Sequence, residues 1–306
     1  MILTTQLKRD TLDAIKHDFT LKNESRNYSQ ARHATFLGVN PSIYSRLNKG
    51  DVEKVLSEGE WIRIAKKLKV DAITDSWKVA RTRSFNMITA QLKLCMNESL
   101  GGIFCDDSSI GKTFACETFA AKYANVAYVD CSLITTWSEL LRAVAIAFGY
   151  PPAGKLSELR RALIDHILCL DKPMIILDEV GDLNDPAWLK LKGLWNALEY
   201  MCGWYMTGAN GLKHKIENKI TWNKVGFEEM FNRMGNRFQS VTCNASGKKK
   251  TPGEISIIKR EGIELMVRAN APHLDAEAVA EVVANCGENA RRVRFELAKL
   301  KNRKAA

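Results

Sequence analysis

The sequence lacks long apolar runs, an N-terminal signal pattern and closely paired cysteines. None of its 306 residues belongs to a run of 18 apolar residues, so we expect no membrane-spanning helix. The first residues contain no basic segment followed by an apolar one, as a signal peptide would. These absences lead us to expect a cytoplasmic protein without a membrane partner.

The eight cysteines form no Cys-x-x-Cys pair, and most of them lie within apolar runs. Zinc sites and disulfide frameworks depend on characteristic cysteine spacings, which are missing here. We therefore interpret the cysteines as small buried hydrophobic residues of a protein in a reducing compartment.

The composition indicates a globular chain with an excess of positive charge. Hydrophobic residues make up 46% of the sequence, and the length suits two or three domains. The formal net charge is +10, of which residues 1–76 contribute +3 and residues 248–306 contribute +5. A surplus concentrated at the two ends favours an anionic polymer as a partner, although the same charge also serves solubility.

The segment Asp106–Thr113 has the form of a phosphate-binding loop, Gly-x-x-x-x-Gly-Lys-Ser/Thr, with aspartate at the first glycine position. The apolar residues 100–105 before it predict a short buried strand, and residues 114–121 predict a helix, which is the context that this motif requires. The alternative is a chance Gly-Lys-Thr at a helix start. Because Asp106 adds negative charge, we expect its side chain to point away from phosphate.

In such a loop, backbone N–H groups at the helix start and the positive end of the helix dipole bind the anion. Lys112 would add a point charge on the β- and γ-phosphates, and the Thr113 hydroxyl would ligate Mg²⁺. The residues that we expect to bind nucleotide here are Ser108, Ser109, Ile110, Gly111, Lys112, Thr113 and Phe114.

A second motif, Met174–Glu179, consists of four apolar residues followed by two carboxylates. It predicts a buried parallel strand that ends in acidic side chains, the Walker-B arrangement. Asp178 would complete the Mg²⁺ shell, and Glu179 would polarise the attacking water as general base. An apolar run ending in two acids is common by chance, but it is uncommon at this distance after a Gly-Lys-Thr loop. The two motifs together predict an ATPase that uses ATP and Mg²⁺.

Residues 30–47 predict two short helices joined by a tight turn. Gly38 lies where such a turn needs a positive φ, and Asn40 can cap a second helix that has Pro41 in its first turn. This spacing is that of a helix-turn-helix and resembles the DNA-binding domains of phage repressors, whose second helix enters the major groove. An ordinary helical hairpin is the alternative. The residues expected to face outward and contact duplex DNA are Ser42, Tyr44, Ser45, Arg46 and Lys49.

The order of the predicted elements divides the chain into three parts. Residues 1–75 predict an all-α helix-turn-helix domain. Residues 76–250 alternate strand and helix signals, which predicts an α/β fold with a parallel sheet sandwiched by helices. Residues 251–306 predict a small helical lid, which follows a flexible junction at residues 247–253.

Three further polar positions follow the two motifs in an order that suits an ATPase. Asn210 comes just after a predicted strand and could reach the γ-phosphate or the attacking water. Arg233 and Arg237 are four residues apart, and one of them could stabilise transition-state charge at the nucleotide of a neighbouring subunit. Arg291 opens the last helix and could reach over the nucleotide. Each signal is weak alone, because such residues usually lie at turns or on solvated surfaces.

The phosphate loop, the Walker-B strand and these polar positions, in this order, resemble the AAA+ ATPases of the initiator clade. With a repressor-like helix-turn-helix in front, the chain is similar to the target-selection ATPases of transposing phages and transposons. The resemblance implies the roles of sensor 1 for Asn210, arginine finger for Arg233 or Arg237, and sensor 2 for Arg291. It also implies assembly as a helical filament on duplex DNA with little sequence preference, and activation of a DDE-type transposase.

The same resemblance places DNA along the centre of the filament. The residues that it predicts to face this centre are Thr135, Thr136 and Trp137 after one strand, and Lys190 and Lys192 after the Walker-B strand. For the two lysines, an exposed helix face is the alternative. Two other functions fit the same motifs: a sequence-specific transcriptional regulator with an ATPase module, and a helicase loader or replication initiator.

Overall fold

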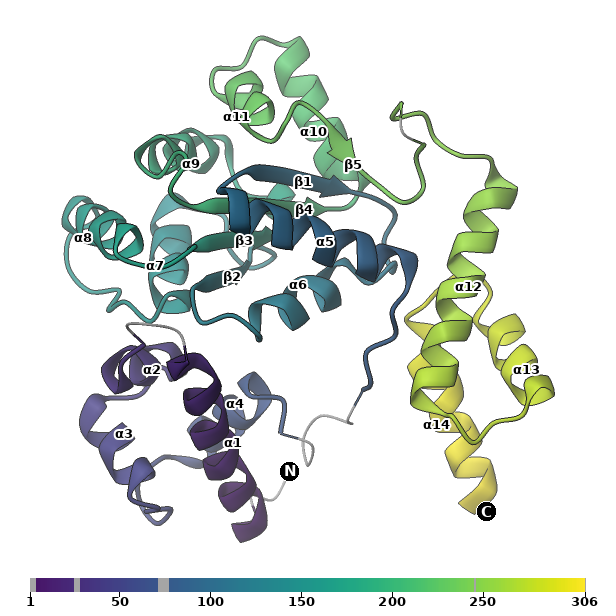
Figure 1. Ribbon diagram of the computed structural model, residues 1–306, viewed down its shortest axis with the longest axis horizontal. Helices are drawn as coiled ribbons and strands as arrows, with labels where there is room; N and C mark the ends of the chain where they lie inside the picture. The colour runs from purple at the N-terminus through teal and green to yellow at the C-terminus, as the bar shows by residue number, and fades with distance from the viewer. Residues whose placement is uncertain (1–3, 25–27, 71–76, 245, 306) are drawn as a thin grey trace.

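A parallel sheet of five strands, in the order β2-β3-β4-β1-β5, organises the centre of the computed structural model (Figure 1). The structure describes residues 4–24, 28–70, 77–244 and 246–305. The predicted α/β fold, with a parallel sheet between helices, is confirmed. The strands are β1 (Gly101–Cys105), β2 (Val126–Asp130), β3 (Met174–Asp178), β4 (Gly203–Gly208) and β5 (Phe238–Gln239).

The central strands are mostly apolar because helices cover both of their faces, and their polar residues, Asp178 and Thr207, lie at the carboxyl ends. Every residue of β3 and of β4 is buried. β1 lies next to β4, with Gly101 opposite Trp204 and Cys105 opposite Gly208. Since all the strands are parallel, the segments that follow β1, β3 and β4 emerge at one edge of the sheet, where open α/β folds bind their ligands.

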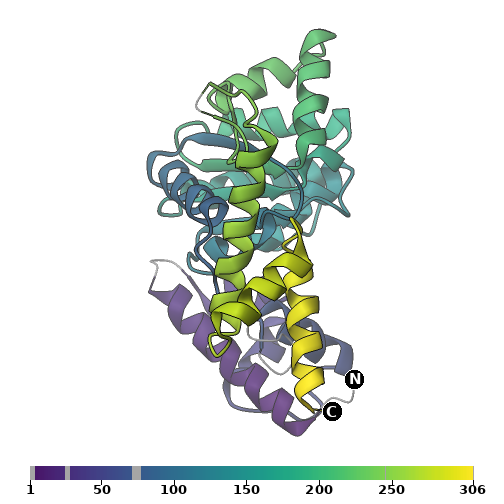
Figure 2. The same ribbon diagram turned by 90° about the vertical axis from the view of Figure 1, so that its right-hand side faces the viewer.

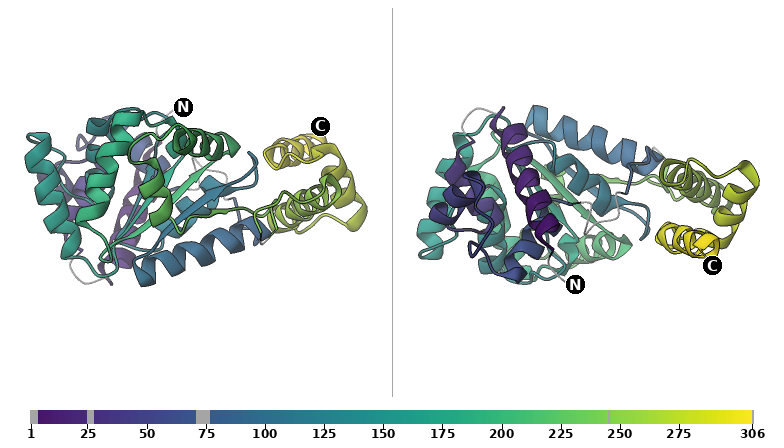
Figure 3. Two further views of the ribbon diagram at one scale, coloured as in Figure 1. Left: turned by 90° about the horizontal axis from the view of Figure 1, so that it is seen from above. Right: turned by 90° about the horizontal axis from the view of Figure 1, so that it is seen from below.

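Helices cover the two faces of the sheet, as the views from above and below show (Figure 3). One face packs on α5 (Arg83–Glu98) and α6 (Lys112–Ala120) through a cluster that contains Phe104, Ile176 and Tyr205. A second cluster, around Ile103, Ile175 and Trp204, fills the other face. The elements on that side are α7 (Trp137–Ala147), α8 (Leu156–Leu168), the short 3₁₀ helix η1 (Val180–Asp182), α9 (Asp185–Ala197), α10 (Asn210–Thr221) and α11 (Phe227–Arg233).

Four N-terminal helices pack around a hydrophobic cluster of their own, which contains Ile15, Leu37 and Trp61. The turn between the second and third helices has Gly38 at φ +69°, and the Asn40 side chain accepts a hydrogen bond from Ser42 N at 3.0 Å. Both features agree with the sequence-based expectation. The helices are α1 (Thr5–Asn23), α2 (Gln30–Leu37), α3 (Pro41–Asn48) and α4 (Glu58–Lys67).

The prediction that Tyr44 faces outward is wrong. Only 1% of its surface is exposed, and its hydroxyl lies 2.7 Å from His33 Nδ1. Tyr44 lies three residues before Leu47, which is fully buried, and this spacing places both on the inner face of α3. The remaining residues that we predicted to face outward are exposed, namely Ser42, Ser45, Arg46 and Lys49.

The N-terminal helices contact the central unit through Arg32 of α2. Its guanidinium donates hydrogen bonds to Phe148 O at 2.7 Å, to Asn125 Oδ1 at 3.1 Å and to Ala124 O at 3.1 Å. The approach is close at Gly149, where a Cβ would lie 2.5 Å from Arg32 Cγ. Three hydrogen bonds from a buried planar cation define how α2 sits on the central unit.

Beside the sheet lies a helical unit made of α12 (Pro252–Asn270), α13 (Ala276–Cys286) and α14 (Arg292–Ala305) (Figure 2). These helices share a cluster around Ile263, Val267 and Val293. The predicted boundary between residues 75 and 76 lies outside the described residues, whereas the one between residues 250 and 251 falls just before α12. We call α12–α14 the lid helices.

No helix in the described part of the chain combines the length and the hydropathy of a membrane span. All eight cysteines carry free thiols, and six of them are buried, as we expected for small hydrophobic residues. Cys169 is exposed and Cys243 is partly exposed, so the interpretation as buried residues does not apply to these two.

Candidate nucleotide-binding site

The loop between β1 and α6 has the backbone shape of an anion-binding site. Gly111, just before α6, has φ +89°, and Ser109 has φ +66°. Left-handed positions within such a turn bring successive N–H groups towards one concave side, where they bind anions. The positive end of the α6 dipole adds to this attraction.

A cavity of about 470 Å³ lies over this loop, a size typical of small-molecule sites. Loop and α6 residues line one side, and Glu179 lines it from the end of β3. Ile110 does not line it, because its side chain is buried beneath the loop, where its carbonyl accepts from Ser84 Oγ at 2.5 Å. The predicted nucleotide-binding residues that line this cavity are Ser108, Ser109, Gly111, Lys112, Thr113, Phe114 and Arg291.

The Lys112 side chain is held over the loop. Its Nζ donates to Asp106 O at 3.0 Å and to Asp107 O at 2.9 Å. Burial lowers the pKa of Lys112, while the carboxylates of Glu179 and Asp178 act in the opposite direction. Phosphate oxygens are stronger acceptors than carbonyl groups for an ammonium donor. Lys112 is therefore placed to exchange these carbonyl acceptors for a phosphate.

The Asp106 carboxylate points towards the segment after β5, and it does not line the cavity. Its Oδ2 accepts from Ser240 Oγ and Val241 N, both at 2.7 Å, and its Oδ1 accepts from Thr242 Oγ1 at 2.5 Å. The residue is fully buried. The side chain at the first glycine position thus faces away from the phosphate-binding side, as we expected, and ties the loop to the neighbouring segment.

Restoring glycine at this position is expected to destabilise the protein. In Asp106→Gly, the buried N–H and hydroxyl donors of residues 240–242 lose their charged acceptor, at a cost of roughly 2–5 kcal/mol. Urea unfolding would measure this loss. Asp106→Asn keeps one acceptor oxygen and should lose less stability. If Asp106→Gly were as stable as the parent, the hydrogen bonds at Asp106 would contribute nothing.

Asp178 ends β3 and is held by the strands on both sides. Its carboxylate accepts from Thr207 Oγ1 on β4, from Tyr128 Oη on β2 at 3.1 Å, and from Glu179 N at 3.1 Å. Only 1% of its surface is exposed. These three donors give the carboxylate one defined orientation behind the cavity.

Glu179, the next residue, has the left-handed backbone angle φ +47°, which is unusual for a residue other than glycine. Glu179 lines the cavity, whereas Asp178 lies behind it. Burial and the neighbouring Asp178 raise the pKa of Glu179. Non-glycine residues in this backbone region cluster at active sites, where the surrounding structure maintains the strain.

Thr113 and Asp178 supply oxygen ligands of the kind that Mg²⁺ prefers. Thr113 is exposed at the start of α6 and lines the cavity. No group of three or more His, Cys, Asp or Glu residues suited to a metal occurs in the described residues. This donor set fits a cation that is bound jointly with phosphate and water, as Mg²⁺ usually is in nucleotide sites.

Asn210 starts α10 just after β4 and contacts the phosphate loop. Its Nδ2 donates to Asp107 Oδ1 at 2.9 Å, and Lys259 of α12 lies 2.9 Å from Asp107 Oδ2. Burial acts to raise the pKa of Asp107, but the hydrogen bonds from Lys259 and Asn210 outweigh it and lower the pKa. One loop carboxylate therefore joins the loop, the end of β4 and the lid helices.

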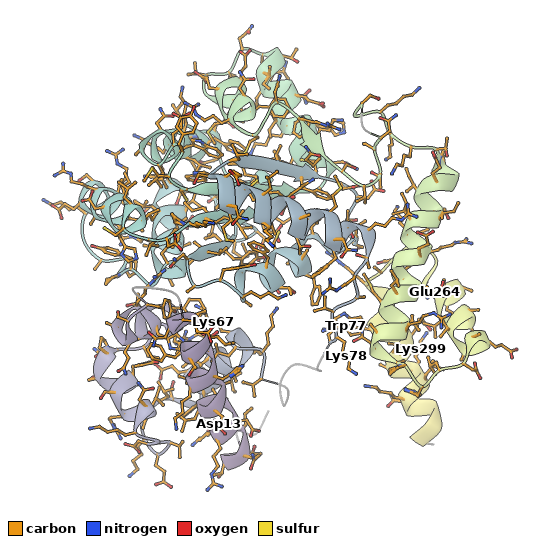
Figure 4. All side chains as sticks on the ribbon, in the orientation of Figure 1. Asp13, Lys67, Trp77, Lys78, Glu264 and Lys299 are labelled. Carbon is orange, nitrogen blue, oxygen red and sulfur yellow. The ribbon has the colours of Figure 1, made fainter. Side chains whose placement is uncertain are left out.

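Trp77 and Arg294 are among the lining residues that sequence reasoning did not assign to the site. Trp77 lies between the central unit and the lid helices (Figure 4), and the Arg294 guanidinium lies 4.9 Å from the centre of its ring. Arg291 and Arg294 are about one helical turn apart, and this spacing could have indicated that both face the same site. Trp77 carried no such signal, because its position depends on the packing of the lid helices.

Arg233 and Arg237 do not line this cavity. Arg233 ends α11 and donates to Asn196 Oδ1 at 2.7 Å and to Glu229 O at 3.3 Å. Arg237 is exposed just before β5. A residue that serves another subunit has to lie away from the site of its own chain, and the greater exposure of Arg237 favours it over Arg233 for such a role.

The residues predicted to face DNA at the centre of a filament lie in two places, around the start of α7 and on α9. Thr136 caps α7 in a reciprocal arrangement with Glu139, and Trp137 is partly buried against the core. Lys192 forms an ion pair with Glu229 at 2.8 Å, so a DNA contact would have to replace this partner. Thr135 and Lys190 are exposed, Thr135 before α7 and Lys190 on α9.

Residues 102–216 match a protein-family model described as AAA domain. The matched segment runs from β1 into α10 and includes the phosphate loop, Asp178, Glu179 and Asn210. A search among curated proteins found no match. The chain therefore contains an AAA-type domain, and its parallel sheet flanked by helices fits this family of nucleotide-dependent ATPases.

Proposed function

We propose that this protein is an ATP-dependent, largely sequence-non-specific DNA-binding ATPase that assembles as a filament on duplex DNA, selects target DNA and activates a DDE-type transposase. The observation that carries the ATPase part is that Lys112, Thr113, Glu179 and Arg291 line one and the same cavity. The AAA domain match supports it. The order of motifs is similar to that of the transposition protein B of phage Mu, which motivates the transposition part.

In the proposed hydrolysis, the loop N–H groups and Lys112 bind the β- and γ-phosphates. Glu179 accepts a proton from the attacking water while the water oxygen bonds to the γ-phosphorus. The bond between this phosphorus and the β–γ bridging oxygen breaks, which yields ADP and phosphate. Thr113 and Asp178 would hold Mg²⁺, which would neutralise part of the phosphate charge. The raised pKa of Glu179 makes it a stronger base than an ordinary glutamate.

Assembly is part of the proposal, because the arginine candidates lie outside the cavity of their own chain. In an assembled form, Arg237 or Arg233 of one subunit would approach the γ-phosphate bound by the next subunit. A guanidinium in this position stabilises the charge of the transition state. Hydrolysis would then depend on neighbouring subunits and would release the assembly from DNA.

The DNA-binding part is supported by charge and by exposed residues. The chain carries a net charge of +10, and α3 presents Ser42, Ser45 and Arg46 to solvent. Arg46 also forms an exposed ion pair with Asp51 at 2.7 Å. Exposed pairs of this kind contribute little free energy, so a DNA phosphate can replace Asp51 at small cost.

ATP is expected to strengthen binding of duplex DNA, and ADP is not. Because lysine and arginine contacts to phosphate release counterions, 6–10 such contacts would lower the affinity by about 10³- to 10⁵-fold between 50 and 200 mM salt. Fluorescence anisotropy with a labelled duplex of random sequence would measure both effects. A DNA affinity that is the same with ATP, with ADP and without nucleotide would contradict the proposal.

The exposed residues of α3 also favour a second candidate, a sequence-specific transcriptional regulator with an ATPase module. This candidate predicts one preferred duplex site with a large specificity ratio. Selection from random duplexes would return an enriched motif for a regulator and none for the proposed non-specific protein. A helicase loader, which fits the same motifs, would co-purify with a helicase and not with a transposase.

A further inference from the structure

A second cavity, of about 540 Å³, lies between the N-terminal helices and the central unit. We call it the interdomain cavity. One wall comes from α1, α2 and the end of α4, and the other from α6, β2 and α7. Lys67 lies at the border of the two units (Figure 4). The volume is typical of sites for small organic ligands.

The N-terminal wall carries more cations than carboxylate partners. Lys22 pairs with Asp18 at 2.9 Å, and Lys69 pairs with Glu117 of α6 at 3.1 Å. Lys67 instead donates to the carbonyl oxygen of Phe36. Within the described residues, neither Lys66 nor Lys67 has a carboxylate at ion-pair distance. Two lysines that line the cavity therefore lack an anionic partner.

Lys67 lines the cavity and is influenced by two cationic groups, Lys22 and Arg63, and by the carboxylate of Asp18, which acts in the opposite direction. Its Nζ lies 4.0 Å from the centre of the Phe36 ring, and Lys22 Nζ lies 3.6 Å from the same ring. The enclosure of Lys67 and the charges of Lys22 and Arg63 lower the pKa of Lys67 to about 8. An anion placed beside Lys67 would offset this repulsion and favour the charged amine.

The opposite wall is mainly apolar and aromatic, and it also carries the carboxylates of Glu117 and Asp130. It is formed by side chains of β2, α7 and the residues near them, including Val126, Val129, Ile134, Ile146, Tyr123 and Tyr128. A hydrated inorganic ion has no apolar surface to bury there, whereas an organic body does. Tyr128 also donates to Asp178, so the wall is one hydrogen bond from the candidate ATPase site.

We propose that the interdomain cavity binds a small organic anion, whose charged group contacts Lys66 and Lys67 and whose flat apolar body lies against β2 and α7. The volume, the unpaired lysines and the apolar wall carry this inference. It concerns a site separate from the phosphate loop, and it does not depend on the function proposed above.

The probe for this site is 1-naphthalenesulfonate, which combines an anion with a flat apolar body. Calorimetric titration of the full chain should show saturable binding at one site. Uncharged 1-naphthalenemethanol should bind at least about tenfold more weakly, because it offers the lysines no charged acceptor. The absence of saturable binding, or equal affinity for the two compounds, would overturn the proposal.

Three variants locate the binding site. Lys67→Met removes the charge and keeps most of the length of the side chain, so it should weaken binding at least about tenfold. Ala143→Phe places a ring in the cavity and should abolish binding. Lys93→Met, at an exposed position of α5, is the matched control and should bind as the parent does. Parent-like affinity in both cavity variants would overturn the proposal.

Aromatic sulfonates also bind nucleotide sites, so Lys112→Ala serves as a further control. Binding of the probe should be unchanged in this variant, and its loss would overturn the proposal by placing the probe over the phosphate loop. Melting temperatures would establish that each variant is folded. If Lys67→Met did not fold, Lys66→Met would replace it, with the same expected loss of affinity.

Discussion

Lys112→Ala is expected to weaken the binding of ATP strongly, by a factor of at least roughly 30. Lys112 is buried, and hydrogen bonds from its ammonium group to Asp106 O and Asp107 O hold it over the loop. Removing one partner of a buried charged pair costs about 2–5 kcal/mol, which corresponds to an affinity roughly 30-fold to several thousand-fold lower. Titration calorimetry with ATP and Mg²⁺ would measure the change.

The matched control is Lys93→Ala, since Lys93 is an exposed lysine of α5. This variant should bind ATP as the parent does. Circular dichroism would show whether both variants retain the fold, because Lys112 also bonds two loop carbonyl groups. Parent-like ATP affinity in a folded Lys112→Ala would mean that the loop does not bind phosphate through this side chain.

Glu179→Gln is expected to keep ATP binding while lowering the rate of hydrolysis by about 10²- to 10⁴-fold, the usual contribution of a general base. Glutamine has nearly the same shape but cannot accept a proton from the attacking water. The measurement is the steady-state rate of phosphate release at saturating ATP. Glu158→Gln, on the exposed face of α8, is the control and should hydrolyse ATP at the parental rate.

The same assignment predicts the pH dependence of the parent. Burial and Asp178 raise the pKa of Glu179 above its ordinary value of 4.5, and a base acts only when it is deprotonated. Hydrolysis should therefore fall as the pH drops through this raised pKa. Glu179→Gln should lose this limb of the pH–rate profile. An unchanged limb, or a parental rate in the variant, would transfer the role of base to another group.

Local sequence signals identified most elements around the candidate site. The strand before the phosphate loop, the helix after it and the buried strand that ends at Asp178 all appear where the apolar runs and the Gly-Lys-Thr motif predict them. The turn at Gly38 and the Asn40 cap depend on backbone angles and short-range hydrogen bonds, which adjacent residues determine. For such features a few neighbouring residues contain the necessary information.

The error at Tyr44 shows the limit of this reasoning. A tyrosine on a short helix suits either face, and the sequence does not reveal that His33 of α2 offers a buried hydrogen-bond partner. The hydrogen-bond partners of the Asp106 carboxylate were also not predictable from the sequence. Its charge predicted that it turns away from phosphate, but the donors of residues 240–242, more than 130 residues away, were not foreseeable.

The sequence by itself determined the α/β fold class, the phosphate loop and the paired carboxylates, because hydrophobic periodicity and glycine geometry act over a few residues. Tertiary structure alone decided which distant groups meet: Asp107 with Asn210 and Lys259, Trp77 with Arg294, and Arg32 with Asn125. These contacts depend on how helices pack on the sheet. Packing results from the shapes of many side chains together, and no short segment records it.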